Sequence, residues 1–150
     1  RILSGLYGVL RPLDLIQPYR LEMGTRVANK AGKNLYEFWG ERLLKAINAE
    51  LTDMPRPVAI NLASEEYFKA AVGSKIKGQL IQPVFEDWKN GQYKIISFFA
   101  KRARGLMVRY ALQQRAATPE QLKGFDLEGY RFAPAASGPD RLVFRRTSTT

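Results

Sequence analysis

Two glycines three residues apart, Gly5 and Gly8, mark the stretch near the start of the chain whose residue types could bind a ligand. Glycine loses more backbone entropy than other residues in a helix or a strand, so the stretch from Leu3 to Val9 predicts a tight turn. Backbone N–H groups near the two glycines could contact a phosphate, and Arg11 and Arg20 would add positive charge. The alternative is a turn whose glycines allow close packing against another element.

A second candidate is the basic segment from Lys89 to Arg115, which has seven basic residues and no acidic one. An exposed helix face usually mixes charges of both signs, because oppositely charged residues four apart stabilise the helix. We therefore expect a surface that faces an anion, and an ordinary basic face is the alternative. The residues expected to carry it are Lys101, Arg102, Arg104 and Arg109.

A third candidate lies where the apolar run of residues 58–62 meets Ser64. The run predicts a buried strand, and Ser64 predicts the N-cap of a short helix that extends to about Val72. Functional groups often lie at the carboxyl end of such a strand, so Asn61, Ser64 and Tyr67 could line a pocket. The alternative is that Ser64 only caps the helix and Asn61 only completes a backbone hydrogen bond.

The composition narrows the classes of function. A chain of 150 residues with 45% hydrophobic and 25% charged residues predicts a single domain, residues 1–150, with a sizeable core. The formal net charge of +10 favours a polyanionic partner, which could be DNA, RNA, an anionic membrane or a phosphorylated small molecule. The chain has no cysteine and no histidine, which excludes disulfides, thiol chemistry and the usual zinc ligands. We expect no metal site and no cofactor.

The apolar runs are too short for a membrane span, and the start of the chain lacks the order of a signal peptide. We therefore expect a cytoplasmic protein without a membrane partner. Because the first residue is Arg1, we also expect the sequence to be part of a longer protein.

Three further helices are predicted, two of them with the help of local capping signals. Apolar residues at helical spacing predict a helix over residues 35–51, with Asn34 as its N-cap and Glu37 three residues later. A second helix is expected over residues 100–115 and would carry the basic residues. Thr118 begins another capping box, which opens a short helix that Gly124 ends.

Two hairpins are expected beside these helices, so the fold class is mixed α/β with a central mixed sheet. The pair Asn90-Gly91 predicts a type I′ hairpin between strands at residues 80–87 and 92–100. Pro83 cannot donate a backbone hydrogen bond, which suggests an edge position or a bulge in the first of these strands. Residues 130–133 and 142–146 predict a closing hairpin, and residues 147–150 are expected to fray.

Six motifs follow one another over nearly the whole chain: Leu3 to Asp14, Gln17 to Gly24, Tyr36 to Gly40, Asn61 to Ser64, Lys94 to Ser97 and Ala100 to Gly105. Together they closely resemble the bacterial YaaA family of peroxide-stress resistance proteins. The resemblance is loose only after Gly129. It implies a cytosolic DNA-binding protein that limits damage from hydrogen peroxide and intracellular iron, with a mixed α/β fold and a basic cleft. It also implies a helix-hairpin-helix element, of which Leu3 to Val9 resembles the hairpin, and a further N-terminal segment that is absent here.

The first functional hypothesis is a protein that binds DNA phosphates through backbone or structure, without sequence preference. The residues expected to bind DNA or phosphate are Ser4, Gly5, Tyr7, Gly8, Arg11, Arg20, Lys101, Arg102, Arg104 and Arg109. Tyr7 or Tyr19 could also stack on an exposed base. The alternative is an enzyme that acts on a nucleobase or nucleotide in a pocket lined by the same motifs, with Lys101 as base or nucleophile. A third hypothesis is an interaction domain whose charge only aids solubility.

Overall fold

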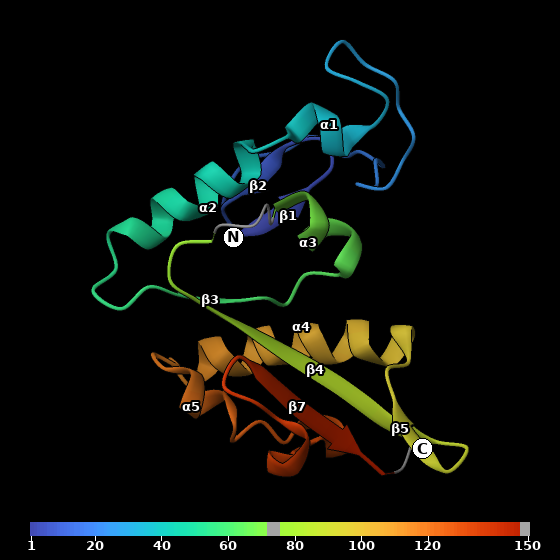
Figure 1. The fold of residues 1–150 in the computed structure, drawn as a ribbon, viewed down its shortest axis with the longest axis vertical. Helices are drawn as coiled ribbons and strands as arrows, with labels where there is room; N and C mark the ends of the chain where they lie inside the picture. The colour runs from blue at the N-terminus through green and yellow to red at the C-terminus, as the bar shows by residue number, and fades with distance from the viewer. Residues whose placement is uncertain (72–75, 148–150) are drawn as a thin grey trace. The chain divides into compact units, whose positions relative to one another are not determined.

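A computed structural model of the protein describes residues 1–71 and 76–147. The chain forms two compact units (Figure 1). The first contains Arg1–Pro57 and Ala63–Gln79, and the second contains Val58–Leu62 and Leu80–Thr150. The chain combines helices with strands, including a mixed sheet, which confirms the predicted mixed α/β class. The single domain expected from the sequence stays a prediction.

The first unit combines a small hairpin with three helices. Strands β1 (Ile2–Ser4) and β2 (Gly8–Leu10) pair antiparallel, with Ser4 opposite Gly8. The helices are α1 (Leu35–Trp39), α2 (Arg42–Thr52) and α3 (Glu65–Ala71). The buried core that these elements share consists of Met23, Leu35, Leu43, Ala70 and Ala71.

The turn predicted around the two glycines is confirmed, because it joins β1 to β2. The helix-hairpin-helix element is wrong here, since a strand and not a helix stands on each side of the turn. The physical reason is that residues 2–4 and 8–10 pair with each other through their backbones, and this pairing excludes a helix.

The helix predicted over residues 35–51 is divided in two. Asn34 caps α1 as expected, because its side chain accepts a hydrogen bond from the Glu37 N–H at 2.9 Å. Gly40 then adopts a φ of 49°, a conformation that ends a right-handed helix, and its N–H donates to the Tyr36 carbonyl at 2.8 Å. The chain begins again as α2 at Arg42.

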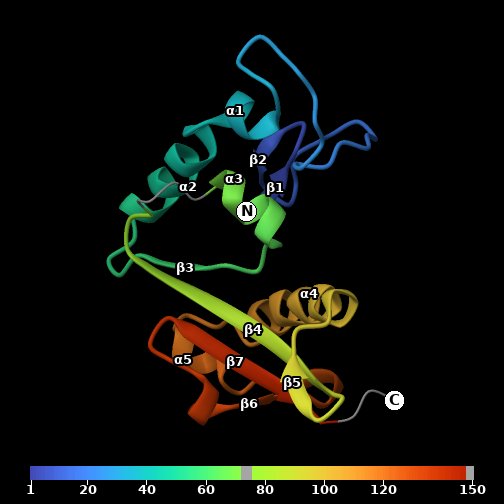
Figure 2. The same ribbon diagram turned by 45° about the vertical axis from the view of Figure 1, so that its right-hand side comes forward.

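The second unit is a mixed sheet with helices beside it. The strands are β3 (Val58–Ile60), β4 (Gln79–Lys89), β5 (Gln92–Lys94), β6 (Arg131–Phe132) and β7 (Arg141–Arg146). Their order is β3-β4-β7-β6, and β5 pairs with β4 (Figure 2). Strands β4 and β7 are parallel, whereas β5 pairs with β4, and β6 with β7, in the antiparallel sense.

The main helix of this unit, α4 (Ser97–Gln113), runs alongside β4 and β7 (Figure 1). Shorter elements follow it: α5 (Pro119–Leu122) and the 3₁₀ turns η1 (Leu127–Gly129) and η2 (Pro134–Ala136). The helix contributes Ala103 and Met107 to a core that also contains Phe85 and Phe144, whose rings stack at 5.4 Å. The small side chain of Ala103 lets the helix backbone approach the aromatic layer.

Several local predictions for this unit are confirmed. Asn90 and Gly91 have φ values of 54° and 79°, as a type I′ hairpin requires. Thr118 and Gln121 form the predicted capping box at the start of α5. Strand β6 pairs with β7 as the closing hairpin. Of residues 147–150, which were expected to fray, residues 148–150 lie outside the described residues.

The second strand of the Asn90-Gly91 hairpin is shorter than predicted. Strand β5 ends at Lys94, and α4 begins at Ser97 instead of near residue 100. The apolar residues that suggested a strand include Phe98, which is 73% exposed on α4, and Phe99, which contacts Arg146. These residues belong to a helix that packs on the sheet on one face only.

The bulge suggested at Pro83 is wrong, because the register of β4 with β7 is continuous from Gln82 to Asp87. The edge position holds only locally, because β4 is an interior strand that extends past the end of β3. The Ile81 carbonyl accepts from Asn61 on the β3 side, and the Gln82 N–H donates to Asp140 on the β7 side. Backbone groups alternate between the two sides of a strand. Pro83 therefore faces the β3 side, beyond the end of that strand, where the ladder needs no donor.

Candidate functional site

Ser4 lies at the centre of a polar network in the turn between β1 and β2. Its side chain is buried, and its Oγ accepts hydrogen bonds from the N–H groups of Leu6 at 3.2 Å and Tyr7 at 2.9 Å. The Tyr19 hydroxyl lies 2.5 Å from the same Oγ. The Tyr7 hydroxyl accepts from the Gln17 N–H at 3.1 Å. Two turn amides that could have faced a phosphate are therefore bound within the chain.

Both glycines of the turn are packed against other parts of the first unit. A Cβ at Gly5 would stand 2.6 Å from the Leu21 carbonyl oxygen. A Cβ at Gly8 would stand 2.8 Å from the Trp39 ring, and the Trp39 Nε1–H donates to the Gly5 carbonyl at 3.0 Å. Close packing, the alternative left open by the sequence, accounts for both glycines. Contact of a phosphate with their backbone stays a prediction.

The two arginines after the turn differ in how free they are. The Arg11 guanidinium binds the Asp14 carboxylate at 2.8 Å, and the Arg11 N–H donates to the same group at 2.7 Å. This backbone hydrogen bond and the side-chain pair hold the pKa of Asp14 below its usual value. The Arg20 side chain is 92% exposed and lies 3.9 Å from Glu22. Arg20 is therefore the more accessible of the two cations.

The basic residues of α4 share an exposed face with apolar ones. The exposed face, called the α4 face below, consists of Phe98, Lys101, Arg102, Gly105, Val108, Arg109 and Leu112. Successive residues of a helix are rotated by about 100°, which brings these seven onto one side. No acidic residue occurs in α4, and a Cβ on Gly105 would meet nothing within 4 Å. The α4 face therefore carries positively charged side chains around Gly105, which has no side chain of its own.

Arg104 lies apart from this face. Its side chain is half-buried, and burial lowers the pKa of its guanidinium. A half-buried guanidinium can reach a ligand less readily than the exposed Lys101 and Arg109. Of the four basic residues predicted here, the structure brings three onto one exposed face and separates Arg104 from them.

Arg102 has a partner that the sequence did not indicate. Its Nε–H donates to the Glu128 carboxylate at 2.6 Å, and the two side chains form an ion pair. The hydrogen bond raises the pKa of Arg102 and lowers the pKa of Glu128. Residues 89–115 themselves contain no acidic residue. Glu128, which contacts Arg102, comes from η1, farther along the chain.

A buried carboxylate, Asp87, was missed by the sequence analysis. It accepts a hydrogen bond from the Tyr130 hydroxyl at 3.0 Å and one from the Arg146 Nε–H at 2.7 Å. Burial is the main reason why the pKa of Tyr130 is raised, and the hydrogen bond to Asp87 adds to it. The Arg146 guanidinium also lies against the rings of Tyr130 and Phe99, at 4.6 and 4.9 Å from their centroids. The network joins the ends of β4 and β7.

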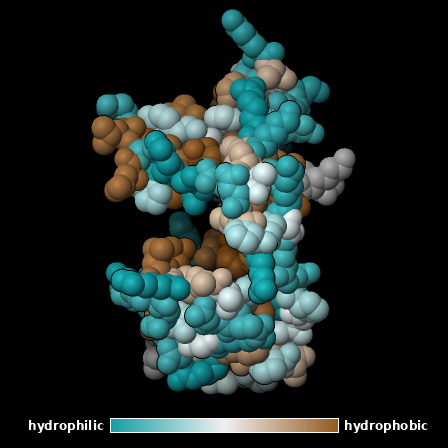
Figure 3. Space-filling view, turned by 90° about the vertical axis from the view of Figure 1, so that its left-hand side faces the viewer, coloured by the Kyte–Doolittle hydropathy of each residue, from teal (hydrophilic) through white to brown (hydrophobic). Residues whose placement is uncertain are grey.

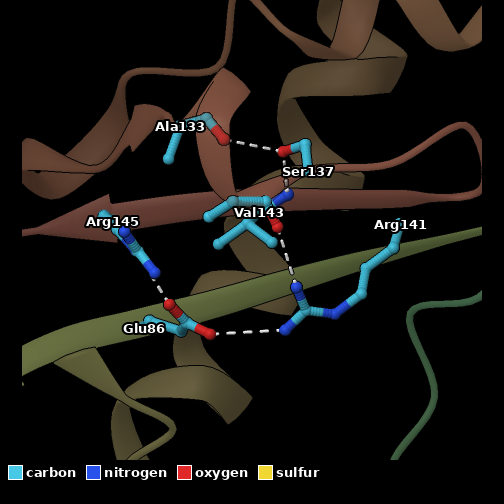
Figure 4. A network of polar contacts seen from close by, with 7 residues as sticks. Glu86, Ala133, Ser137, Arg141, Val143 and Arg145 are labelled. Atoms are coloured by element: carbon cyan, nitrogen blue, oxygen red, sulfur yellow. Dashed lines mark hydrogen bonds and ion pairs between the residues drawn. The ribbon is translucent and has the colours of Figure 1, made fainter.

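A second carboxylate of β4, Glu86, holds two arginines of β7 (Figure 4). Arg145 donates to it at 2.9 Å and Arg141 at 3.3 Å. The Ser137 hydroxyl, shown in the same view, donates to the Ala133 carbonyl and accepts from the Val143 N–H, both at 2.9 Å. Together with Arg146 on Asp87, these contacts show that the positive charge of β7 is used within the sheet.

The three residues predicted to line a pocket are divided between the units. Asn61 belongs to the second unit, where its N–H donates to the Ile81 carbonyl at 2.8 Å. Ser64 belongs to the first unit, and its carbonyl accepts from Phe68 at the start of α3. Tyr67 is half-buried on that helix, and burial raises the pKa of its hydroxyl. A common pocket stays a prediction, and the expected helix end at Val72 lies outside the described residues.

Within residues 1–71 and 76–147, no three or more acidic side chains gather in a way that could hold a metal ion. None of the helices in this part of the chain is long and apolar enough to cross a membrane. Hydrophobic residues do reach the surface beside hydrophilic ones, as Figure 3 shows for one face.

Comparison with known proteins adds a family to this geometry. A family model described as "Peroxide stress protein YaaA" matches residues 1–136. A UPF0246 protein of Dechloromonas aromatica is 74% identical over 146 residues, which cover 97% of this chain and 57% of that protein. UPF0246 proteins of Paracidovorax citrulli and Ralstonia nicotianae are each 64% identical, over 97% of this chain and 56% and 57% of their own lengths. The chain thus spans little more than half the length of these relatives.

Proposed function

Because this chain belongs to the YaaA family of peroxide stress proteins, we propose that it acts in peroxide stress by binding DNA through the α4 face. The observation that carries the proposal is the exposure of Lys101, Arg102 and Arg109 on one side of a helix that has no acidic residue. A formal net charge of +10 for the whole chain supports the same class of partner.

The α4 face suits the backbone of DNA better than its base edges. Lysine and arginine side chains that bind phosphates fix the position of a protein on a duplex but carry no sequence information. Phe98, which is 73% exposed beside the cations, adds an apolar contact for a sugar or an unpaired base. We therefore propose binding that depends on DNA structure and on salt, with protection of DNA from peroxide and iron as its consequence.

The alternative of a nucleobase or nucleotide enzyme is not proposed, because no observation favours it. The basic cleft and the cytoplasmic location implied by the resemblance stay predictions.

The proposal is tested by measuring the affinity for labelled duplex, single-stranded and bulged DNA over a series of salt concentrations. Wild-type protein is compared with Lys101→Ala/Arg109→Ala and with the control Arg26→Ala/Lys30→Ala, which removes two exposed cations from the first unit. Each lost phosphate contact reduces the slope of log K against log salt by about 0.9. We expect the α4 variant to lose about two units of slope and the control to lose none. Equal losses in both variants would reject the α4 face as the binding surface.

A further inference from the structure

The hydrogen atoms of the network around Ser4 can be assigned from the number of bonds that each oxygen can make. A hydroxyl oxygen has one hydrogen to donate and two lone pairs to accept with. Both lone pairs of Ser4 Oγ are used, because they accept the N–H groups of Leu6 and Tyr7. The contact of 2.5 Å between Ser4 and Tyr19 therefore uses the Ser4 hydrogen, and the Tyr19 oxygen accepts it.

Among residues 1–71 and 76–147, which the structure describes, this assignment leaves the hydrogen of the Tyr19 hydroxyl without an acceptor. The Tyr7 hydroxyl is in the same state, because its oxygen accepts from the Gln17 N–H at 3.1 Å. The two rings meet edge to face, with centroids 5.3 Å apart. Tyr19 is 38% exposed, so its side chain reaches the surface of the first unit. Two phenol groups thus lie side by side, and each oxygen already accepts one hydrogen bond from within the chain.

We infer that Tyr7 and Tyr19 form a hydrogen-bond-donating site for a phosphate oxygen. A phosphate oxygen accepts hydrogen bonds and carries negative charge, which strengthens the bonds that it accepts from hydroxyl groups. Arg20 follows Tyr19 directly in the chain, and its side chain, which is 92% exposed and lies 3.9 Å from Glu22, adds a positive charge to this segment. This role differs from base stacking, since the edge of one tyrosine ring already packs against the face of the other.

The inference rests on the proposed function where the phosphate belongs to DNA, and a free phosphate compound offers the same oxygen chemistry. In both cases the part played by Ser4 is to position Tyr19: it fixes the hydroxyl by donating to it. The network also explains the use of a serine at a buried position, because alanine there could neither accept the two turn amides nor orient Tyr19.

The test compares Tyr19→Phe and Tyr7→Phe with the control Tyr36→Phe. Tyr36 lies in the same unit, but its hydroxyl already donates to the Glu66 carbonyl at 3.1 Å, so it has no hydrogen to offer a ligand. Affinity for a short duplex is measured at one fixed salt concentration. We expect Tyr19→Phe to weaken binding about five- to tenfold, Tyr7→Phe to weaken it less, and Tyr36→Phe to leave it within about twofold of the wild type.

A second measurement needs no substitution and so does not depend on how a variant folds. Fluorotyrosine is incorporated into the protein, and its fluorine spectrum is followed while inorganic phosphate is added. We expect the signals of Tyr7 and Tyr19 to shift in a saturable way while the signal of Tyr36 stays in place. Equal behaviour of all three signals, together with equal affinities of the Tyr19→Phe and Tyr36→Phe variants, would overturn the inference.

The two proposals fail in different ways. If Lys101→Ala/Arg109→Ala lowers the salt slope but Tyr19→Phe binds the duplex like the wild type, the tyrosine site is rejected and the DNA surface stands. If wild-type protein does not bind DNA but inorganic phosphate shifts the Tyr19 signal, the DNA surface is rejected and the tyrosines bind a small phosphate compound.

Discussion

The ring of Trp39 lies so close to Gly8 that a methyl group on the glycine would stand 2.8 Å from its Cη2 atom. The same indole donates a hydrogen bond to the Gly5 carbonyl. One aromatic residue of α1 thus holds both glycines of the turn between β1 and β2. Gly8 also has a φ of 78°, so its backbone conformation and its packing both require the absence of a side chain.

Substitution of Gly8 by alanine should lower the free energy of unfolding by about 2–4 kcal/mol, because it adds strain at positive φ to a clash with the ring. Gly105→Ala is the matched control, since Gly105 lies in α4 and an added Cβ there would meet no other side chain or distant backbone within 4 Å. Alanine in that helix should stabilise the protein by about 0.5–1 kcal/mol. Urea unfolding followed by circular dichroism measures both changes. A Gly8→Ala protein as stable as the wild type would show that Trp39 moves aside.

Asp87 and Arg146 form a buried ion pair, so we expect the effect on stability of substituting one to depend strongly on whether the other is present. Asp87→Leu alone should lower the free energy of unfolding by about 3–5 kcal/mol, because it leaves the Arg146 charge buried without its partner. The double variant Asp87→Leu/Arg146→Met should be markedly more stable than this single variant. Urea unfolding of the wild type, both single variants and the double variant gives the coupling free energy between the two side chains. Additive losses would show that the two side chains do not interact.

The sequence predicted those features whose whole cause lies within a few residues. The φ values of Asn90 and Gly91 follow from a two-residue turn, and the Thr118 capping box needs only Gln121. Predictions failed where a distant partner decides the outcome. Pro83 is tolerated in an interior strand because β3 ends before reaching it.

The candidate site shows the same division. The exposed cations of α4 could be predicted from helical spacing and from the lack of acidic neighbours in sequence. The neutralisation of Arg102 by Glu128 could not, because η1 reaches the helix only through the path of the chain after α4. The buried position of Asp87 likewise depends on the register that places it opposite Arg146 across two parallel strands.

The raised pKa of the buried Tyr130 hydroxyl leads us to expect a loss of stability at alkaline pH. Its pKa in the folded protein is raised above the ordinary value of 10.0, mainly by burial. Above about pH 10 the unfolded chain releases this proton while the folded protein keeps it, so stability falls as the pH rises. Below about pH 10 the contribution of the Tyr130 hydroxyl to the free energy of unfolding is fully present. Unfolding by urea between about pH 9 and 11 should give a shallower decline for Tyr130→Phe than for the wild type. Identical slopes would show that Tyr130 does not carry the effect.

Glu128 competes with a phosphate for the Arg102 guanidinium, which gives a prediction for DNA binding by the α4 face. Glu128→Gln keeps the shape of the side chain and removes its charge, so Arg102 becomes free to bind a phosphate. We expect affinity for duplex DNA to rise about threefold at low salt, and the salt slope to grow by about 0.9.

The control for this change is Glu120→Gln, which removes a carboxylate paired with Lys123 beside α5 and leaves the α4 face unchanged. Each variant removes one negative charge from the protein. If the cause of a gain were the net charge of the whole protein, both variants would gain affinity for DNA equally, because long-range attraction does not depend on which basic residue the carboxylate contacts. A gain confined to Glu128→Gln, abolished by adding Arg102→Ala, identifies Arg102 as the group released. Weaker binding by Glu128→Gln would instead mean that the carboxylate holds Arg102 in its binding position.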